Sequence, residues 1–175
     1  MKMKTIPCTP ERHSSAIRDI TNEAILNSTA NWAYEPRTTE YMAGWFAAKA
    51  RKNLPVIGVE DDGGTLMGFA TYGPFREHAG YKYSVEHSVY VDARFRGRGV
   101  GKLLLRELIA AAAAQDYHML IGAIDATNPA SIALHRSFGF THCASIKQAG
   151  FKFGRWLDVE FYQLLLKTPA NPTDR

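Results

Sequence analysis

The sequence predicts a single α/β domain with a mixed central sheet flanked by helices. A strand at Glu86–Val91, a glycine-rich loop, a leucine-rich helix and an apolar strand at Met119–Ile124 follow one another. This order predicts two parallel strands joined by a right-handed crossover. Hairpin patterns before and after it add antiparallel strands, and 175 residues suit one domain with a substantial core.

The N-terminal third predicts a short strand and two helices. Lys4–Cys8 is the expected strand, and Pro10 stands where the first residue of a helix is favoured. Apolar residues of this helix recur on one face, namely Ile17, Ile20, Ala24 and Ile25. After a loop at Asn27–Glu35, a second helix is expected from about Thr38, and Pro55 ends it.

The middle of the chain predicts a hairpin followed by a loop. Val56–Glu60 and Leu66–Tyr72 are strand-like and flank an Asp-Asp-Gly-Gly turn. Gly73–Lys82 is the expected loop before the central strand.

The C-terminal third predicts a helix and two strands. Asn128 is a suitable N-cap, Pro129 suits the first helical position, and Gly139 suits the stop. Strands are expected at 141–148 and 158–166, separated by an aromatic and basic segment at 151–156. The domain is expected to cover residues 1–167, with a Pro-rich, disordered tail at 168–175.

Composition excludes several classes of protein. Hydrophobic residues make up 46% of the chain, and the formal charge of +4 is spread without a long basic run, so nucleic-acid binding is not expected. Two cysteines do not suggest a disulfide framework. Neither a signal segment nor a membrane-spanning stretch is visible, so we expect a soluble cytoplasmic protein.

Three kinds of phosphate-binding loop compete for Arg96–Lys102. A P-loop needs Ser or Thr after Gly-Lys, but Leu103 follows Lys102. A dinucleotide fingerprint needs G-x-G-x-x-G, and the three glycines have the wrong spacing. The third is the Arg-x-x-Gly-x-Gly loop of the GCN5-related N-acetyltransferases (GNAT), which Arg96–Gly101 resembles position by position. Glycines before a helix start suit a pyrophosphate, although a solvated turn remains the alternative.

Further strings extend the resemblance over about Lys4–Leu166. Leu134-His135 ahead of Phe138-Gly139-Phe140 is similar to the GNAT superfamily as a whole. Glu86–Val91 (EHSVYV), the stretch from Asn128 to His135 and Lys152–Asp158 (KFGRWLD) are similar to the phosphinothricin and methionine sulfoximine acetyltransferases. Many GNAT members have Tyr where this chain has His135, whereas the phosphinothricin group has His. The resemblance implies the GNAT fold and an acetyl-CoA-dependent N-acetyltransferase of the α-amine of a small amino acid or analogue.

Direct acetyl transfer needs a base for the amine, and Glu86 at the start of the central strand is the expected one. A surface charge is the alternative for Glu86. His135 is the expected acid for the leaving thiolate, with a hydrogen-bonded helix histidine as an equal alternative.

The residues expected to hold acetyl-CoA lie on the central strand, in the loop and on the later helix. They are Val89, Tyr90, Val91, Arg96, Gly97, Arg98, Gly99, Val100, Gly101, Lys102, Asn128 and Ser131. Backbone groups of the strand should pair with the pantetheine arm and stabilise the oxyanion. A solvated role is the alternative for the side chains of Arg98 and Lys102.

The residues expected near the amino-acid substrate lie in the preceding loop and on the central strand. They are Arg76, Glu77, His78, Glu86, His87 and Ser88. The resemblance makes Arg76 an anchor for a carboxylate or phosphinate, since a guanidinium binds such groups with two hydrogen bonds. His87 alternates to the other face from Glu86 and is expected to be structural.

The resemblance also implies a homodimer whose interface includes part of 151–156, where three aromatic residues cluster. No metal is expected, because neither the chemistry nor the histidine spacing requires one. Two alternatives stay open: the same chemistry on a dicarboxylic or aromatic amino acid or a protein N-terminus, and an acetyl-CoA-binding sensor.

Overall fold

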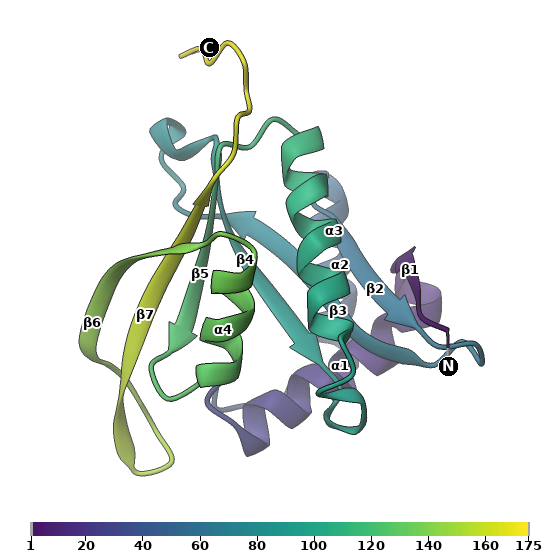
Figure 1. The fold of residues 1–175 in the computed structure, drawn as a ribbon. Helices are drawn as coiled ribbons and strands as arrows, with labels where there is room; N and C mark the ends of the chain where they lie inside the picture. The colour runs from purple at the N-terminus through teal and green to yellow at the C-terminus, as the bar shows by residue number, and fades with distance from the viewer. Residues whose placement is uncertain (1, 175) are drawn as a thin grey trace. The chain divides into compact units, whose positions relative to one another are not determined.

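The structure, a computed structural model, describes residues 2–174, and Figure 1 labels its helices and strands. The helices are α1 Pro10–Asn27, α2 Thr39–Arg51, α3 Val100–Ala114 and α4 Pro129–Ser137, with short 3-10 turns at η1 Ala79–Tyr81 and η2 Ala93–Phe95. The strands are β1 Lys4–Pro7, β2 Val56–Glu60, β3 Leu66–Pro74, β4 Ser84–Val91, β5 Met119–Asp125, β6 Thr141–Lys152 and β7 Arg155–Leu165.

Over the described residues the strands form one sheet in the order β1-β2-β3-β4-β5-β7-β6. The strands β4 and β5, which the α3 connection joins, are parallel, and Glu86 lies opposite Ile121. The pairs β1–β2, β2–β3, β5–β7 and β6–β7 are antiparallel. The predicted mixed sheet with helices is therefore confirmed.

The chain divides into two compact units, Met1–Thr71 with Ser88–Leu108, and Tyr72–His87 with Ile109–Arg175. The boundaries fall inside β3, β4 and α3, so these elements contribute residues to both units. The expectation of one domain over 1–167 stays a prediction.

The first unit has its core between β2–β3 and the helices α1 and α2. The predicted apolar face of α1 is buried, and Met42 and Phe46 of α2 join it. Phe69 of β3 packs edge-on against Trp45 on this side. The preceding residue, Gly68, faces Val100 and Leu104 of α3. Because neighbouring residues of a strand point to opposite faces, α2 and α3 cover opposite faces of β3.

The second unit is built on β5, β7 and β6, which run side by side in Figure 1. The segment 151–156 was expected to separate two strands, and this is wrong. It forms the end of β6, a two-residue turn and the start of β7, with Phe151 opposite Trp156. Phe153 (φ 51°) and Gly154 (φ 71°) both adopt the left-handed conformation that a tight hairpin turn requires.

The C-terminal tail is fastened to the second unit at two points. The Thr168 hydroxyl donates to the carbonyl of Tyr117 at 2.5 Å, and the Thr173 N–H donates to the Tyr83 hydroxyl at 3.1 Å. These hydrogen bonds lie within residues 168–175, for which disorder was expected. The expectation of a disordered tail stays a prediction.

Candidate active site

The glycine loop lies in the first unit, directly before α3. Gly97 (φ 75°) and Gly99 (φ 85°) are in the left-handed region, and a Cβ added at either would meet no atom within 4 Å. The Gly99 carbonyl accepts the first helical hydrogen bonds, from Lys102 at 3.1 Å and Leu103 at 3.2 Å. The loop therefore combines open space beside the glycines with a helix start, whose first N–H groups have no intrahelical acceptor. These features fit a pyrophosphate.

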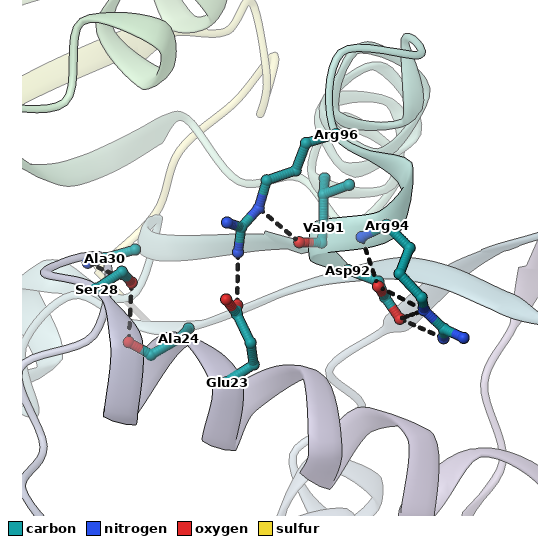
Figure 2. A network of polar contacts seen from close by, with 8 residues as sticks. All are labelled: Glu23, Ala24, Ser28, Ala30, Val91, Asp92, Arg94 and Arg96. Carbon is teal, nitrogen blue, oxygen red and sulfur yellow. Dashed lines mark hydrogen bonds and ion pairs between the residues drawn. The ribbon is translucent and has the colours of Figure 1, made fainter.

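The basic side chains of this loop differ in their partners. Arg96 reaches Glu23 of α1 at 2.6 Å and the Val91 carbonyl at 3.3 Å, as Figure 2 shows. Arg98 is exposed and lies over the Phe95 ring, and Lys102 is exposed at the first turn of α3. Neither Arg98 nor Lys102 makes an ion pair among residues 2–174.

The C-terminal half of β4 is held close to β3 in the same unit. The Asp92 N–H donates to the Met67 carbonyl at 3.0 Å. A Cβ at Gly68 would lie 2.7 Å from the Tyr90 carbonyl oxygen, so only glycine fits there. The Tyr90 ring packs against Phe69, and its hydroxyl accepts a hydrogen bond from Asn31 at 3.0 Å. Tyr90 thus points its side chain into the first unit, while its backbone remains the part expected to meet the cofactor.

Glu86 lies in the second unit, in the N-terminal half of β4, and is half-buried. Burial raises the pKa of its carboxyl, and the positive charge of Arg76 opposes this change. Arg76 is exposed, stacks over the Phe75 ring at 4.2 Å and donates to the Phe75 carbonyl at 2.7 Å. The influence of the Arg76 charge on the pKa of Glu86 is consistent with the two predicted roles, a base and a substrate anchor.

His87 and His135 form a buried pair in the second unit. Their Nε2 atoms are 2.8 Å apart, and the rings stack at 5.0 Å between centroids. His135 Nδ1 is 2.7 Å from the Ser131 carbonyl, which can only accept, so that nitrogen bears the proton. His135 Nε2 therefore accepts a hydrogen bond from His87. Both ring nitrogens of His135 already have partners.

The two histidines are neutral near pH 7. Burial, and then the neighbouring His135, lowers the pKa of His87 to about 3. Burial also lowers the pKa of His135, against a raising effect of the Ser131 carbonyl. His87 Nδ1 makes no well-aligned hydrogen bond among the described residues. The nearby Ile121 carbonyl favours the charged ring and opposes part of the lowering of the His87 pKa.

The start of α4 is arranged as the sequence predicts. The Asn128 side-chain oxygen accepts from the Ser131 N–H at 3.1 Å, which makes Asn128 the N-cap. Ser131 in turn offers its carbonyl to His135. Asn128, Ser131 and His135 thus form one connected set, which also reaches His87.

Comparison with known proteins decides the family. The acetyltransferase (GNAT) family model matches residues 17–140. This chain belongs to the GNAT family. The L-methionine sulfoximine/L-methionine sulfone acetyltransferase of Pseudomonas paraeruginosa is 44% identical over 84% of this chain and 86% of its own.

Two solved acetyltransferase structures cover almost the whole chain. A phosphinothricin acetyltransferase from Sinorhizobium meliloti, in complex with acetyl-CoA, is 33% identical with a TM-score of 0.92, and covers 98% of this chain and 93% of its own. A ribosomal-protein-alanine N-acetyltransferase from Brucella melitensis is 42% identical with a TM-score of 0.91, and covers 93% of this chain and 99% of its own.

Within this GNAT chain the structure gathers the predicted site residues into two groups. Val89–Val91 and Arg96–Lys102 lie in the first unit. Glu86, His87, Asn128, Ser131 and His135 lie in the second unit, as do Arg76, Glu77 and His78 of the exposed loop. Ser88 follows His87 in β4 and belongs to the first unit. The individual roles of these residues stay predictions.

Three further residues contact the predicted site residues and were not expected from the sequence. A Cβ at Gly122 of β5 would lie 3.1 Å from both His135 Nε2 and His87 Cε1, so a glycine makes room for the histidine pair. Gly68 has the corresponding role beside Tyr90, and Glu23 is the partner of Arg96. A glycine inside a strand pattern is a known signal for close approach and could have indicated both glycines.

Among residues 2–174 no group of three His, Cys, Asp or Glu side chains is placed to hold a metal ion. None of the helices in this part of the chain is long and apolar enough to cross a membrane.

Proposed function

We propose that this GNAT acetyltransferase acetylates the α-amine of a small amino acid or analogue of the methionine sulfoximine and phosphinothricin type, as a cytoplasmic homodimer. The observation that carries the proposal is the similarity to the Pseudomonas methionine sulfoximine acetyltransferase, at 44% identity over most of both chains. The electrostatic influence of Arg76 on the half-buried Glu86 supports it, because such substrates present an ammonium beside an anionic group.

Acetyl-CoA supplies an acetyl group activated as a thioester. The backbone of Gly97–Lys102 and the side chains of Arg98 and Lys102 hold its pyrophosphate, and Arg96 begins this loop. The backbone of Val89–Val91 pairs with the amide-rich pantetheine arm. One of these N–H groups stabilises the negative charge that develops on the acetyl oxygen.

Glu86 takes the proton of the substrate ammonium, directly or through a water molecule. The free amine then forms the new C–N bond as the C–S bond breaks, and the sulfur leaves as a thiolate that acquires a proton. Arg76 binds the carboxylate or phosphinate of the acceptor. His135 remains a proposed acid for the sulfur. Because its Nδ1 proton faces the Ser131 carbonyl, this role requires His135 to exchange that partner.

A second acceptor class is favoured by one observation. The Brucella neighbour of 42% identity is described as acting on a ribosomal-protein alanine, so a protein N-terminus is the alternative substrate. Both classes present a primary α-amine, and they differ in whether a free carboxylate lies next to it. Arg76 would distinguish the two substrate classes, because it is proposed to bind this free carboxylate.

The proposed function predicts selective thiol release with methionine sulfoximine and phosphinothricin. The release of CoA thiol is measured across a panel that also includes glutamate, phenylalanine and a short peptide beginning with alanine. We expect the two analogues to give the highest kcat/KM. A peptide that exceeds them would establish the alternative substrate, and acetyl-CoA binding without turnover of any amine would indicate a sensor.

A homodimer through the β6–β7 hairpin is the second prediction of this function. Phe151, Phe153 and Trp156 are exposed by 46%, 56% and 59%, which is unusual for three neighbouring aromatic residues. Trp156→Glu should convert the dimer to a monomer in sedimentation at micromolar concentration. Tyr34→Glu, at an exposed aromatic residue in the α1–α2 loop, is the matched control. A monomeric wild type would contradict the prediction.

A further inference from the structure

Arg96 connects three elements of the first unit. Its Nη2 atom donates to Glu23 Oε2 at 2.6 Å, and its Nε atom donates to the Val91 carbonyl at 3.3 Å. Glu23 belongs to α1, and Val91 is the last residue of β4. Figure 2 shows the contacts of the Arg96 side chain with both. The first residue of the glycine loop is therefore tied to a helix and to the strand that precedes it.

The other charges near the loop follow a pattern. Arg94 is held by Asp92, whose Oδ2 accepts from Nη2 at 2.6 Å and whose Oδ1 accepts from the backbone N–H at 2.9 Å. The arginines ahead of the glycines thus have carboxylate partners, whereas Arg98 and Lys102 have no ion pair among residues 2–174. The cations that are available to an incoming phosphate are those after Gly97.

We propose that Glu23 is a positioning residue for pyrophosphate binding, acting through Arg96. The proposal rests on the proposed binding of acetyl-CoA at this loop. Glu23 and the Val91 carbonyl hold the Arg96 side chain, and this fixes the loop whose backbone N–H groups receive the phosphates. Arg96 then acts as a tether, while Arg98 and Lys102 supply the positive charge.

Simple electrostatics and a positioning role predict opposite changes in acetyl-CoA affinity when Glu23 is replaced. Glu23 is negative, and removing a negative charge from the neighbourhood of an anionic ligand should strengthen binding. If Glu23 merely competed with phosphate for Arg96, its removal would also strengthen binding. A positioning role predicts the reverse, because Gly97 and Gly99 leave the loop conformationally free once the tether is lost.

The experiment is calorimetry of acetyl-CoA binding to the full chain and its variants. Glu23→Gln removes the charge and keeps the shape, and it should weaken binding about threefold to fivefold, as expected for a partly exposed ion pair. Glu23→Asp keeps the charge but shortens the side chain by one methylene, so it should weaken binding as well. Urea unfolding of each variant without acetyl-CoA checks that the fold is retained. We expect it to be, because the Glu23 side chain is partly exposed.

The matched control is Asp19→Asn. Asp19 lies one helical turn before Glu23 on α1 and pairs with Arg18, so its removal changes the charge of the same helix without touching Arg96. Affinity should stay the same or rise. In an Arg96→Gln background, Glu23→Gln should no longer weaken binding, because its partner is already absent.

The outcomes distinguish a failure of the proposed role of Glu23 from a failure of the proposal that acetyl-CoA binds at this loop. Unchanged or tighter binding by Glu23→Gln, with Gly99→Asp still abolishing binding, would overturn the role of Glu23 alone. Wild-type affinity in Gly99→Asp would show that acetyl-CoA does not bind at this loop, and the role of Glu23 would then be overturned with it.

Discussion

Replacing Glu86 by Gln should lower kcat by at least about 10²-fold at pH 7 and leave acetyl-CoA affinity nearly unchanged. The α-ammonium of an amino acid is mostly protonated at this pH and has no free electron pair. The Gln amide preserves the shape of the side chain but cannot take the proton. An effect on kcat with little effect on cofactor binding is expected of a group that acts only in the chemical step.

The surroundings of Glu86 suit a base. Its carboxyl is half-buried on β4, and burial raises its pKa, while Arg76 opposes that change and favours the ionised form. A raised pKa makes the carboxylate a stronger base than an exposed one. The ionised form is lost as pH falls through this raised pKa, so wild-type kcat/KM should fall on the acidic side.

Two measurements check the assignment of Glu86. The activity of Glu86→Gln should recover in part at high pH, where free amine accumulates without a base. Glu107→Gln removes the same group from α3, where it pairs with the exposed Arg106, and should keep wild-type kcat. If Glu86→Gln turns over like the wild type at every pH, then His135 or solvent takes the proton.

Local patterns predicted most elements because each depends on a short stretch of sequence. The apolar face of α1 and the N-cap at Asn128 follow from spacing and from the preference of Asn for this position. The antiparallel strands β6 and β7 were expected, but their inner ends were placed too far apart because the turn is Phe153-Gly154, and Phe is uncommon where φ is positive. The turn forms nonetheless, since long strands on both sides of it pair.

Contacts between distant residues could not be predicted from one sequence. The correct expectation that Glu86 and His87 face opposite ways follows from strand alternation. What His87 meets on its own face depends on α4, which brings His135 against it from 48 positions away. The Glu23–Arg96 pair joins residues 73 positions apart. The sequence indicated His87, His135 and Arg96 as candidate site residues, but it gave no sign of which residues they contact.

Replacing Gly99 by Asp should abolish acetyl-CoA binding while the protein stays folded. Gly99 has φ 85°, which costs most residues about 1–2 kcal/mol, but Asp tolerates this region better than most. It is also the residue directly before α3, so the new carboxylate would lie beside the first N–H groups of the helix. The carboxylate would take the N–H donors that a pyrophosphate needs and would repel its negative charge.

Calorimetry should detect no acetyl-CoA binding by Gly99→Asp, and two further variants separate the causes. Gly64→Asp places the same residue at φ 79° in the β2–β3 turn, again with no atom within 4 Å of the new Cβ, and should bind like the wild type. Gly99→Ala adds strain without charge and should weaken binding less than Asp does, because the donors stay free. If Gly99→Asp binds acetyl-CoA with unchanged affinity, the pyrophosphate is held elsewhere, and the open space beside the glycines has another use.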